Sequence, residues 1–238
     1  MKEKLYTISV NEAFHTDCEC PACVMYQALE KSSIEYTMGP SYMEDDIREM
    51  TNKSGFCAKH VKQLYENQNR LGLALMLSTH MEKILRDTTP LLQAPSKAPS
   101  LLKRKEEKPV VSYIKKIDNS CFVCNHINQT FNRYLSTIFH LYRTEPEFKT
   151  LFRNSKGFCQ PHYGRLYELA ATELSGPTYE SFIKDLNEVY LTNMKRVLAD
   201  LTWLIDKFDY RNVDKPWNNS KDALPRAIQK LNGVTIET

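Results

Sequence analysis

Six of the seven cysteines in this chain fall into two motifs with the spacing of metal ligands. Each motif is a Cys-x-x-Cys pair followed farther along the chain by a Cys-x-x-His pair. Two ligands separated by two residues in the first turn of a helix lie on the same face and can reach one ion. Three thiolates and one imidazole form a closed tetrahedral set, which is typical of structural zinc. The sequence therefore predicts two Zn²⁺ per chain, and the predicted ligands are Cys20, Cys23, Cys57 and His60 in the first copy and Cys121, Cys124, Cys159 and His162 in the second.

The two motifs belong to an internal repeat. The second Cys-x-x-Cys pair follows the first by 101 residues (121 − 20), and the second Cys-x-x-His pair follows the first by 102 residues (159 − 57). The similarity extends past the ligands, because Asn52 corresponds to Asn154 and the Leu-Tyr-Glu run at 64–66 recurs at 166–168. A fixed period of this kind indicates a duplicated structural unit. We expect each copy to bind its own ion and to join two helix starts within one repeat.

Other uses of paired cysteines agree less well with the sequence. Disulfides require an oxidising compartment, and the N-terminal residues lack the apolar segment of a signal peptide. The first pair resembles a thioredoxin-type motif, but no strand pattern surrounds it. A c-type haem requires a histidine directly after the second cysteine, and Asn125 separates Cys124 from His126. An iron–sulfur cluster with three cysteines and one histidine stays open as the alternative to zinc.

Cys18 is the one cysteine outside the motifs. By the repeat spacing it corresponds to Asn119, which is not a metal ligand, so Cys20 is the predicted ligand. An exchange between Cys18 and Cys20 stays open at this point. His80 lies on a predicted helix and is expected to be a core or surface residue. His126 and His140 have no counterpart in the first copy and are not needed as ligands.

The composition favours helices, because glycine is scarce at 7 residues and alternating apolar and polar runs are nearly absent. Apolar residues recur at helical spacing in several segments, including 58–86, 122–142 and 179–208. The fold class predicted is all-α, a helical bundle built from two pseudo-repeated Cys3His metal-pinned helical units plus a long C-terminal helix. A short final helix is expected at 222–231.

The predicted domains follow the repeats along the chain. Residues 1–87 form the first metal-binding helical repeat, and residues 110–238 form the second with the long C-terminal helix and tail. Residues 88–109 between them contain four prolines and a run of charged residues, a composition that predicts a flexible linker.

Several function classes are disfavoured by the sequence. The formal net charge of +3 is small and no basic helix face is present, which argues against a nucleic-acid-binding regulator. No Gly-rich phosphate loop, Ser/His/Asp grouping or His-Glu-x-x-His motif is found, so no catalytic residue is assigned. No stretch is long and apolar enough to span a bilayer. We expect a cytoplasmic zinc-binding scaffold or adaptor for a protein or small-molecule ligand; the alternative is an iron–sulfur or thiol-based redox protein or sensor.

The motifs as a set resemble a family of uncharacterised bacterial proteins, a domain of unknown function. That family carries a Cys-Pro-x-Cys element, a Gly-Phe-Cys-x-x-His element, a second copy of both, and a Trp-containing C-terminal tail. The corresponding residues here are Cys20–Cys23, Gly55–His60 and the tail around Asp214–Trp217 and Asp222. The second copy departs from the pattern at Phe122, where the first has Pro21. The resemblance implies a bacterial, cytosolic protein with these metal sites, and it implies no reaction.

Overall fold

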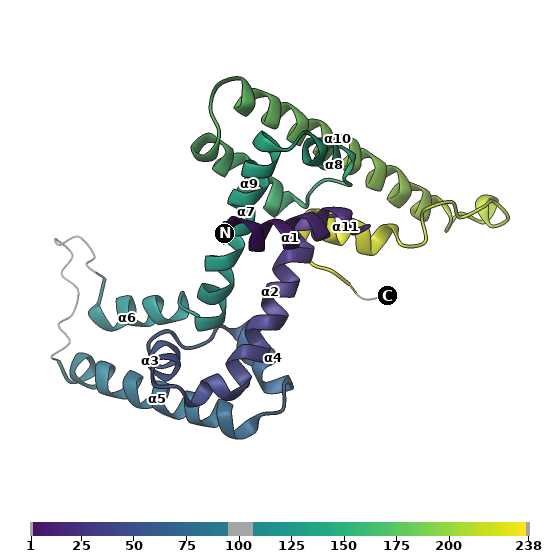
Figure 1. Ribbon diagram of the computed structural model, residues 1–238. Coiled ribbons are helices and arrows are strands. Elements are labelled where there is room, and N and C mark those ends of the chain that lie inside the picture. The colour runs from purple at the N-terminus through teal and green to yellow at the C-terminus, as the bar shows by residue number, and fades with distance from the viewer. Residues whose placement is uncertain (1, 95–106, 237–238) are drawn as a thin grey trace, which may run out of the picture. The chain divides into compact units, whose positions relative to one another are not determined.

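The computed structural model describes residues 2–94 and 107–236, and these residues fold into helices (Figure 1). Eleven α-helices and two short 3-10 helices are present, and no strand occurs in the described ranges. The prediction of an all-α protein is therefore confirmed. In chain order the elements are α1 (Lys2–His15), α2 (Pro21–Met38), η1 (Pro40–Met43), α3 (Asp45–Ser54), α4 (Ala58–Glu66), α5 (Arg70–Gln93), α6 (Pro109–Asp118), α7 (Phe122–Thr144), α8 (Pro146–Asn154), α9 (Gln160–Glu173), α10 (Gly176–Asp206), η2 (Tyr210–Asn212) and α11 (Ala223–Asn232).

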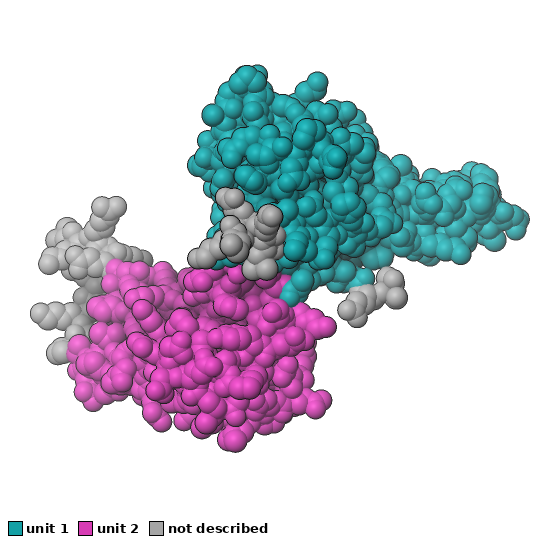
Figure 2. Space-filling model, in the orientation of Figure 1, with its two compact units in different colours: residues 1–28, 131–238 teal, residues 29–130 magenta. Residues whose placement is uncertain are grey.

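The helices pack into two compact units, which Figure 2 shows in different colours. Unit 1 comprises residues 1–28 and 131–238, and unit 2 comprises residues 29–130. The division falls inside α2 and inside α7, so each of these helices contributes to both units. The units therefore do not coincide with the predicted domains 1–87 and 110–238. The difference arises because the start of α2 packs with helices of the second repeat, and the start of α7 packs with helices of the first.

The predicted linker, 88–109, is helical at both of its ends. Helix α5 continues through Pro90 to Gln93, and α6 begins at Pro109, which suits the first turn of a helix. Residues 95–106, the larger part of this segment, lie outside the described residues.

The long helix expected at 58–86 is interrupted. Helix α4 ends at Glu66, and α5 begins at Arg70. Gln68 between them has a left-handed backbone (φ 73°), and the Asn69 side chain accepts a hydrogen bond from the backbone N–H of Gly72. This N-cap starts a new helix in a new direction, and the periodicity of apolar residues does not reveal it.

The core of unit 1 is aromatic, and helix α1 is packed onto it. The ring of Phe14 on α1 lies 4.9 Å from that of Phe148 on α8. Phe152 and Phe182 are 5.3 Å apart, and Phe158, which directly precedes Cys159, lies 5.5 Å from Phe152. Edge-on and tilted pairs of this kind add to the free energy gained by burying the rings. The aromatic core thus ends at a predicted metal ligand.

The core of unit 2 is mainly aliphatic and includes His80, which is buried as is the predicted metal ligand His60. His80 on α5 is hydrogen-bonded through Nδ1 to the backbone carbonyl of Asn52, at 2.6 Å. His80 is buried and belongs to neither cysteine cluster, which agrees with the prediction that it is not a ligand. The apolar members of this core include Ile34, Met38, Ile47, Leu64, Leu73, Met76, Val123 and Ile127.

Candidate metal centres

The eight predicted ligands gather in two clusters of four. In each cluster the four ligand atoms all lie within 4.8 Å of one another. We call the cluster in unit 1 site A and the cluster in unit 2 site B. Site A consists of Cys20, Cys23, Cys159 and His162, and site B consists of Cys57, His60, Cys121 and Cys124.

This grouping corrects the pairing expected from the order of the chain. The prediction that each repeat holds its own ion is wrong, because the Cys-x-x-Cys pair of each repeat lies against the Cys-x-x-His pair of the other. Both pairings give three cysteines and one histidine per site, so the spacing of the motifs cannot distinguish them. The structure places the start of α2 beside the start of α9, and the start of α7 beside the start of α4.

Two helix N-termini converge at each site. In site A, Cys20 directly precedes α2 and Cys159 is the N-cap residue of α9, while Cys23 and His162 lie in the first turns. Site B is built in the same way from the starts of α7 and α4. The positive ends of the two helix dipoles favour thiolates at this position. The local geometry therefore suits three negatively charged sulfurs.

The glycine of each Gly-Phe-Cys segment adopts a backbone that only glycine takes readily. Gly55 has φ 60° and Gly157 has φ 79°. A Cβ at Gly55 would lie 2.4 Å from Nε2 of His80, and one at Gly157 would lie 3.1 Å from Val189 Cγ1. The turn and the close approach together explain why glycine precedes the Phe-Cys step in both repeats.

The distances in site A match the edges of a tetrahedron around one ion. The Sγ atom of Cys159 lies 3.8 Å from that of Cys20 and 3.6 Å from that of Cys23. His162 Nδ1 lies 3.2 to 3.5 Å from the three sulfurs. Four ligands around a zinc ion with a Zn–S bond of about 2.3 Å are separated by about 3.8 Å between sulfurs.

Site B has the same dimensions. The Sγ atoms of Cys57 and Cys124 are 3.9 Å apart, and His60 Nδ1 lies 3.2 to 3.4 Å from the three sulfurs. A disulfide bond joins its sulfurs at about 2.05 Å, so these separations exclude one. All seven cysteines are free thiols.

The thiols within each site differ in pKa. Hydrogen bonds from Cys20 and Cys23 lower the pKa of Cys159 to about 4, and the same cluster raises that of Cys23. In site B, burial and the neighbouring Cys121 raise the pKa of Cys124 to about 12. Burial opposes ionisation of Cys57, but hydrogen bonds, first that from the backbone N–H of His60, lower its pKa. Protons are thus shared within each cluster, and a metal ion replaces such protons when it binds.

A carboxylate supports the histidine of site B. Glu30 Oε1 accepts a hydrogen bond from Nε2 of His60 at 3.0 Å, while Nδ1 of the same ring faces the sulfurs. Gln63 and Lys59 also contact this carboxylate. Burial opposes ionisation of Glu30, but hydrogen bonds from Lys59, Gln63 and His60 outweigh it and lower the pKa. Carboxylates in this position fix the orientation of metal-bound histidines.

Site A has aromatic rings where site B has the carboxylate. The ring centroid of Phe131 lies 5.3 Å from that of His162, and Tyr26 lies 6.5 Å away. Phe131 follows Glu30 by 101 residues (131 − 30), so the two occupy equivalent positions in the repeat. The two sites therefore have the same ligands in different surroundings.

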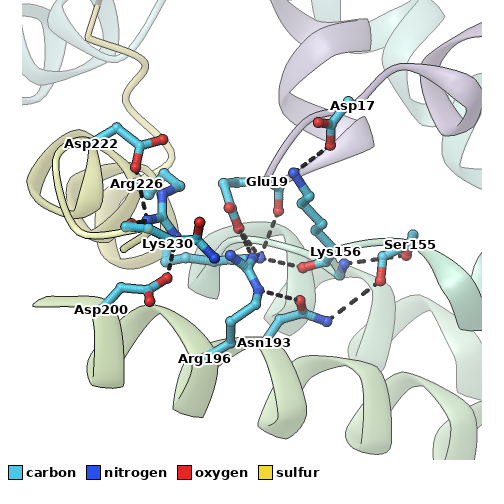
Figure 3. Close-up of polar contacts among 12 residues, drawn as sticks. Asp17, Glu19, Ser155, Lys156, Asn193, Arg196, Asp200, Asp222, Arg226 and Lys230 are labelled. Atoms are coloured by element: carbon cyan, nitrogen blue, oxygen red, sulfur yellow. Dashed lines mark hydrogen bonds and ion pairs between the residues drawn. The ribbon is translucent and has the colours of Figure 1, made fainter. Parts of the chain in front are cut away.

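A buried cation lies beside the backbone segment that leads into Cys20, and Figure 3 shows its contact with Glu19. Lys230 on α11 is 1% exposed and donates to the backbone carbonyl of Glu19 at 2.7 Å, directly before Cys20. The Glu19 carboxylate accepts a hydrogen bond from the Arg196 guanidinium, with Nη2 and Oε2 2.6 Å apart. After the hydrogen bonds from the neighbouring thiols, the charge of Lys230 contributes to the lowered pKa of Cys159. The carbonyl of Gly233, after α11, lies 3.7 Å from Cys23 Sγ, so the end of α11 covers the site.

The supporting residues were missed by sequence reasoning. Glu30 lies seven residues after Cys23, two turns along the same face of α2, and this spacing is the one signal that could have found it. The role of Lys230 could not be predicted, because nothing in the sequence indicates that α11 packs against the first Cys-x-x-Cys motif. Cys18 lies outside both clusters, with Sγ 3.9 Å from the carbonyl of Ala13, and burial raises its pKa to about 11.

Comparisons with known proteins place the chain in a family. No curated protein and no solved structure matches it. One family model matches residues 1–238, and its description is a family of unknown function (DUF6062). The match covers the whole chain, including both motifs, the second repeat and the C-terminal tail. The chain therefore belongs to this family of unknown function, DUF6062.

Proposed function

We propose that the protein is a zinc-pinned helical scaffold, with one Zn²⁺ bound at site A and one at site B. The observation that carries the proposal is the spacing of the four ligand atoms in each cluster, all within 4.8 Å. A protein that fills all four tetrahedral positions leaves none for water or substrate, which is the property of structural rather than catalytic zinc. The ions in this proposal stabilise the fold and take no part in a reaction.

The same spacing favours a single ion over an iron–sulfur cluster. In a polynuclear cluster the cysteines bind different iron atoms and must therefore stand farther apart than ligands of one ion. Sulfur separations of 3.6 and 3.8 Å in site A and 3.9 Å in site B fit a single ion. Mixed sulfur and imidazole ligation in tetrahedral geometry is the preference of zinc.

Each ion would connect segments that are distant along the chain. Site A joins Cys23 to Cys159 across 136 positions, and site B joins His60 to Cys121 across 61. Structural zinc contributes about 10 kcal/mol or more of apparent binding free energy, whereas domains are stable by about 5–15 kcal/mol. The fold of each unit is thus expected to depend on its ion.

The biological task that fits such a scaffold is binding of a protein or small-molecule ligand in the cytoplasm, where thiols stay reduced. Among the described helices, none has the length and apolar character needed to cross a membrane. Cysteine clusters without an open coordination position support a binding role and argue against enzymatic activity.

One observation favours a second candidate, a thiol-based redox sensor. Cys57 and Cys124 of site B are partly exposed, and the pKa of Cys57 is lowered. Thiolate character and exposure make a cysteine susceptible to oxidation, and oxidation of a ligand would release the metal.

Elemental analysis and an absorption spectrum of the full chain, purified without air, test the proposal. We expect two zinc ions per chain and no visible colour. Iron with acid-labile sulfide would overturn it, as would a chain that folds with no metal. A titration with peroxide separates the two candidates, because a sensor releases zinc from site B at low oxidant while a structural site retains it.

A further inference from the structure

Helix α10 carries an exposed hollow over its C-terminal half, and none of the residues that line it is a predicted metal ligand. The hollow has a volume of about 500 Å³ and is lined by Lys195, Leu198, Ala199, Thr202, Trp203 and Asp206. Leu198 is 62% exposed in spite of its apolar side chain. Figures 1 and 2 show the end of α10 and the chain after it projecting from the rest of unit 1. Most of the lining residues are exposed.

The lining residues are arranged symmetrically about the midpoint between Asp200 and Leu201. Lys195 and Asp206 are equally far from that midpoint on the central line of the face. The small residues Ala199 and Thr202 form an inner pair at equal distances from it. Leu198 and Trp203 form the third pair and flank the central line on opposite sides. Reversing the direction of the helix therefore places each residue at the level of its symmetry mate.

The two charged residues of this face have no partner of opposite charge. Neither Lys195 nor Asp206 forms an ion pair within residues 2–94 and 107–236. By contrast, Arg196 and Asp200 on the packed side of α10 are paired with Glu19 and Arg226. The exposed face thus holds one positive and one negative charge, at opposite ends of an apolar hollow with small residues at its centre.

The C-terminal end of α10 is fixed by hydrogen bonds to the chain that follows it. Lys207 is buried and donates to the carbonyls of Asn212, Val213 and Lys215 at 2.6 to 2.8 Å. Trp203 Nε1 donates to the carbonyl of Pro216 at 3.0 Å. These bonds fix the chain beyond α10, so the face does not have to be ordered when a partner binds.

We propose that this face of α10 binds the same face of a second copy of the chain, with the two helices antiparallel. A two-fold axis through the midpoint brings Lys195 of each copy to Asp206 of the other, and this self-complementarity is what an isologous dimer requires. Ala199 and Thr202 let the two backbones approach closely, and Leu198 and Trp203 fill the space on either side. Binding of an unrelated partner would not explain why Lys195 and Asp206 lie at equal distances from the midpoint of the face.

The dimer is expected to be weak to moderate in affinity. The face spans twelve residues of one helix (195–206), which is small beside the surface of stable interfaces, about 1,200 to 2,000 Å² in total. Charged pairs at the edge of an interface contribute to orientation and specificity more than to affinity. The association should therefore depend on concentration.

Sedimentation of the metal-loaded full chain over a range of concentrations tests the proposal. The mass should rise from the 27.7 kDa of one chain towards twice that value. Lys195→Asp and Asp206→Lys each place two pairs of like charges in the dimer, and each should raise the dissociation constant about tenfold or more. An equimolar mixture of the two variants restores both opposite-charge pairs and should form a mixed dimer.

Lys184→Asp provides the matched control, because Lys184 is exposed on the same helix outside the hollow. It makes the same charge change and should leave association unaltered. A monomer at all concentrations would overturn the proposal, as would a mixture that stays monomeric or a control that weakens association equally. Metal content is measured on the unaltered chain and on every variant. Absence of zinc from the unaltered chain would count against the zinc-scaffold proposal, and this outcome is distinguished from loss of the dimer in a variant that keeps its zinc.

Discussion

Glu30 and Phe131 occupy equivalent positions in the two repeats, and each lies against the histidine of a different metal cluster. Glu30 accepts a hydrogen bond from His60 at 3.0 Å, whereas the ring of Phe131 lies 5.3 Å from that of His162. A carboxylate makes the imidazole a stronger ligand and holds its orientation, and a phenyl ring does neither by hydrogen bonding. Two sites with identical ligands are therefore expected to respond differently to substitutions around them.

Glu30→Gln should weaken metal binding at site B alone. The substitution keeps the shape of the side chain but removes the charge that His60 faces, and changes of this kind lower affinity about 10- to 100-fold. Competition with a chromophoric chelator should show one zinc ion leaving each chain earlier than in the unaltered protein. Glu35→Gln is the control, because Glu35 is exposed on the same helix. Equal effects of the two substitutions would show that Glu30 does not act through His60.

The pairing of the motifs can be tested by metal counts in double variants. Cys20 and Cys159 lie in one cluster although they belong to different repeats. Substituting both with serine should therefore leave one zinc ion per chain, at site B. Substituting Cys20 and Cys57 should leave none, because these residues belong to different clusters.

If the Cys20/Cys159 double variant bound no zinc and the Cys20/Cys57 double variant bound one, each repeat would hold its own ion, which would contradict the structure. Cys18→Ser serves as the control in this series, since Cys18 lies outside both clusters. It should retain two zinc ions and unfold at nearly the same temperature, whereas Cys57→Ser should cost unit 2 its cooperative unfolding.

The sequence was sufficient for most of the local parts of this fold, although the break between α4 and α5 was missed. The positions of Cys20 and Cys159 before helices follow from the residues around them, and α10 and α11 follow from apolar periodicity. The assignment of clusters did not follow, because Cys-x-x-Cys and Cys-x-x-His pairs are interchangeable between two copies of a repeat. Which helix starts meet is decided by packing between distant segments, and no local pattern records that.

The residues around the metal sites could not be predicted from local sequence patterns either. Glu30 is a member of the helix that starts at site A, yet it serves the histidine of site B. Lys230 reaches Glu19 across 211 positions of the chain, through a helix whose sequence shows only that it is amphipathic. Buried charges of this type are placed by the tertiary fold, and their role becomes visible only when their partners are known.

Metal binding at both sites should strengthen as the pH rises through the neutral range. The pKa of Cys124 is raised to about 12 and that of Cys23 is raised as well, so both thiols carry protons at pH 7 before the ion binds. Binding requires thiolates and releases these protons, so affinity increases about tenfold per pH unit for each proton released. Chelator competition at pH 6, 7 and 8 measures this slope.

Glu30 should not contribute to that slope. Its pKa is lowered from the usual 4.5, so it is ionised throughout the range from pH 6 to 8. A depressed carboxyl pKa gives stability that is present above the unfolded value and is lost as the pH falls through the folded one. The slopes of the unaltered protein and of Glu30→Gln should therefore be the same at site B. An affinity independent of pH would contradict ligation by these thiols.

Lys230→Met should destabilise unit 1 by about 2 kcal/mol, because a buried carbonyl that loses its hydrogen-bond donor costs about 1–3 kcal/mol. The substitution would leave the carbonyl of Glu19 without its buried donor, while Arg196 still holds the carboxylate. Denaturant unfolding of the metal-loaded chain measures the change, with Lys221→Met, an exposed residue before α11, as the control. Because α11 ends at Gly233 against Cys23, site A should also lose its ion to a chelator faster than in the unaltered chain, and site B should not. A change below about 0.5 kcal/mol, as is usual for surface substitutions, would show that Lys230 does not hold α11 on site A.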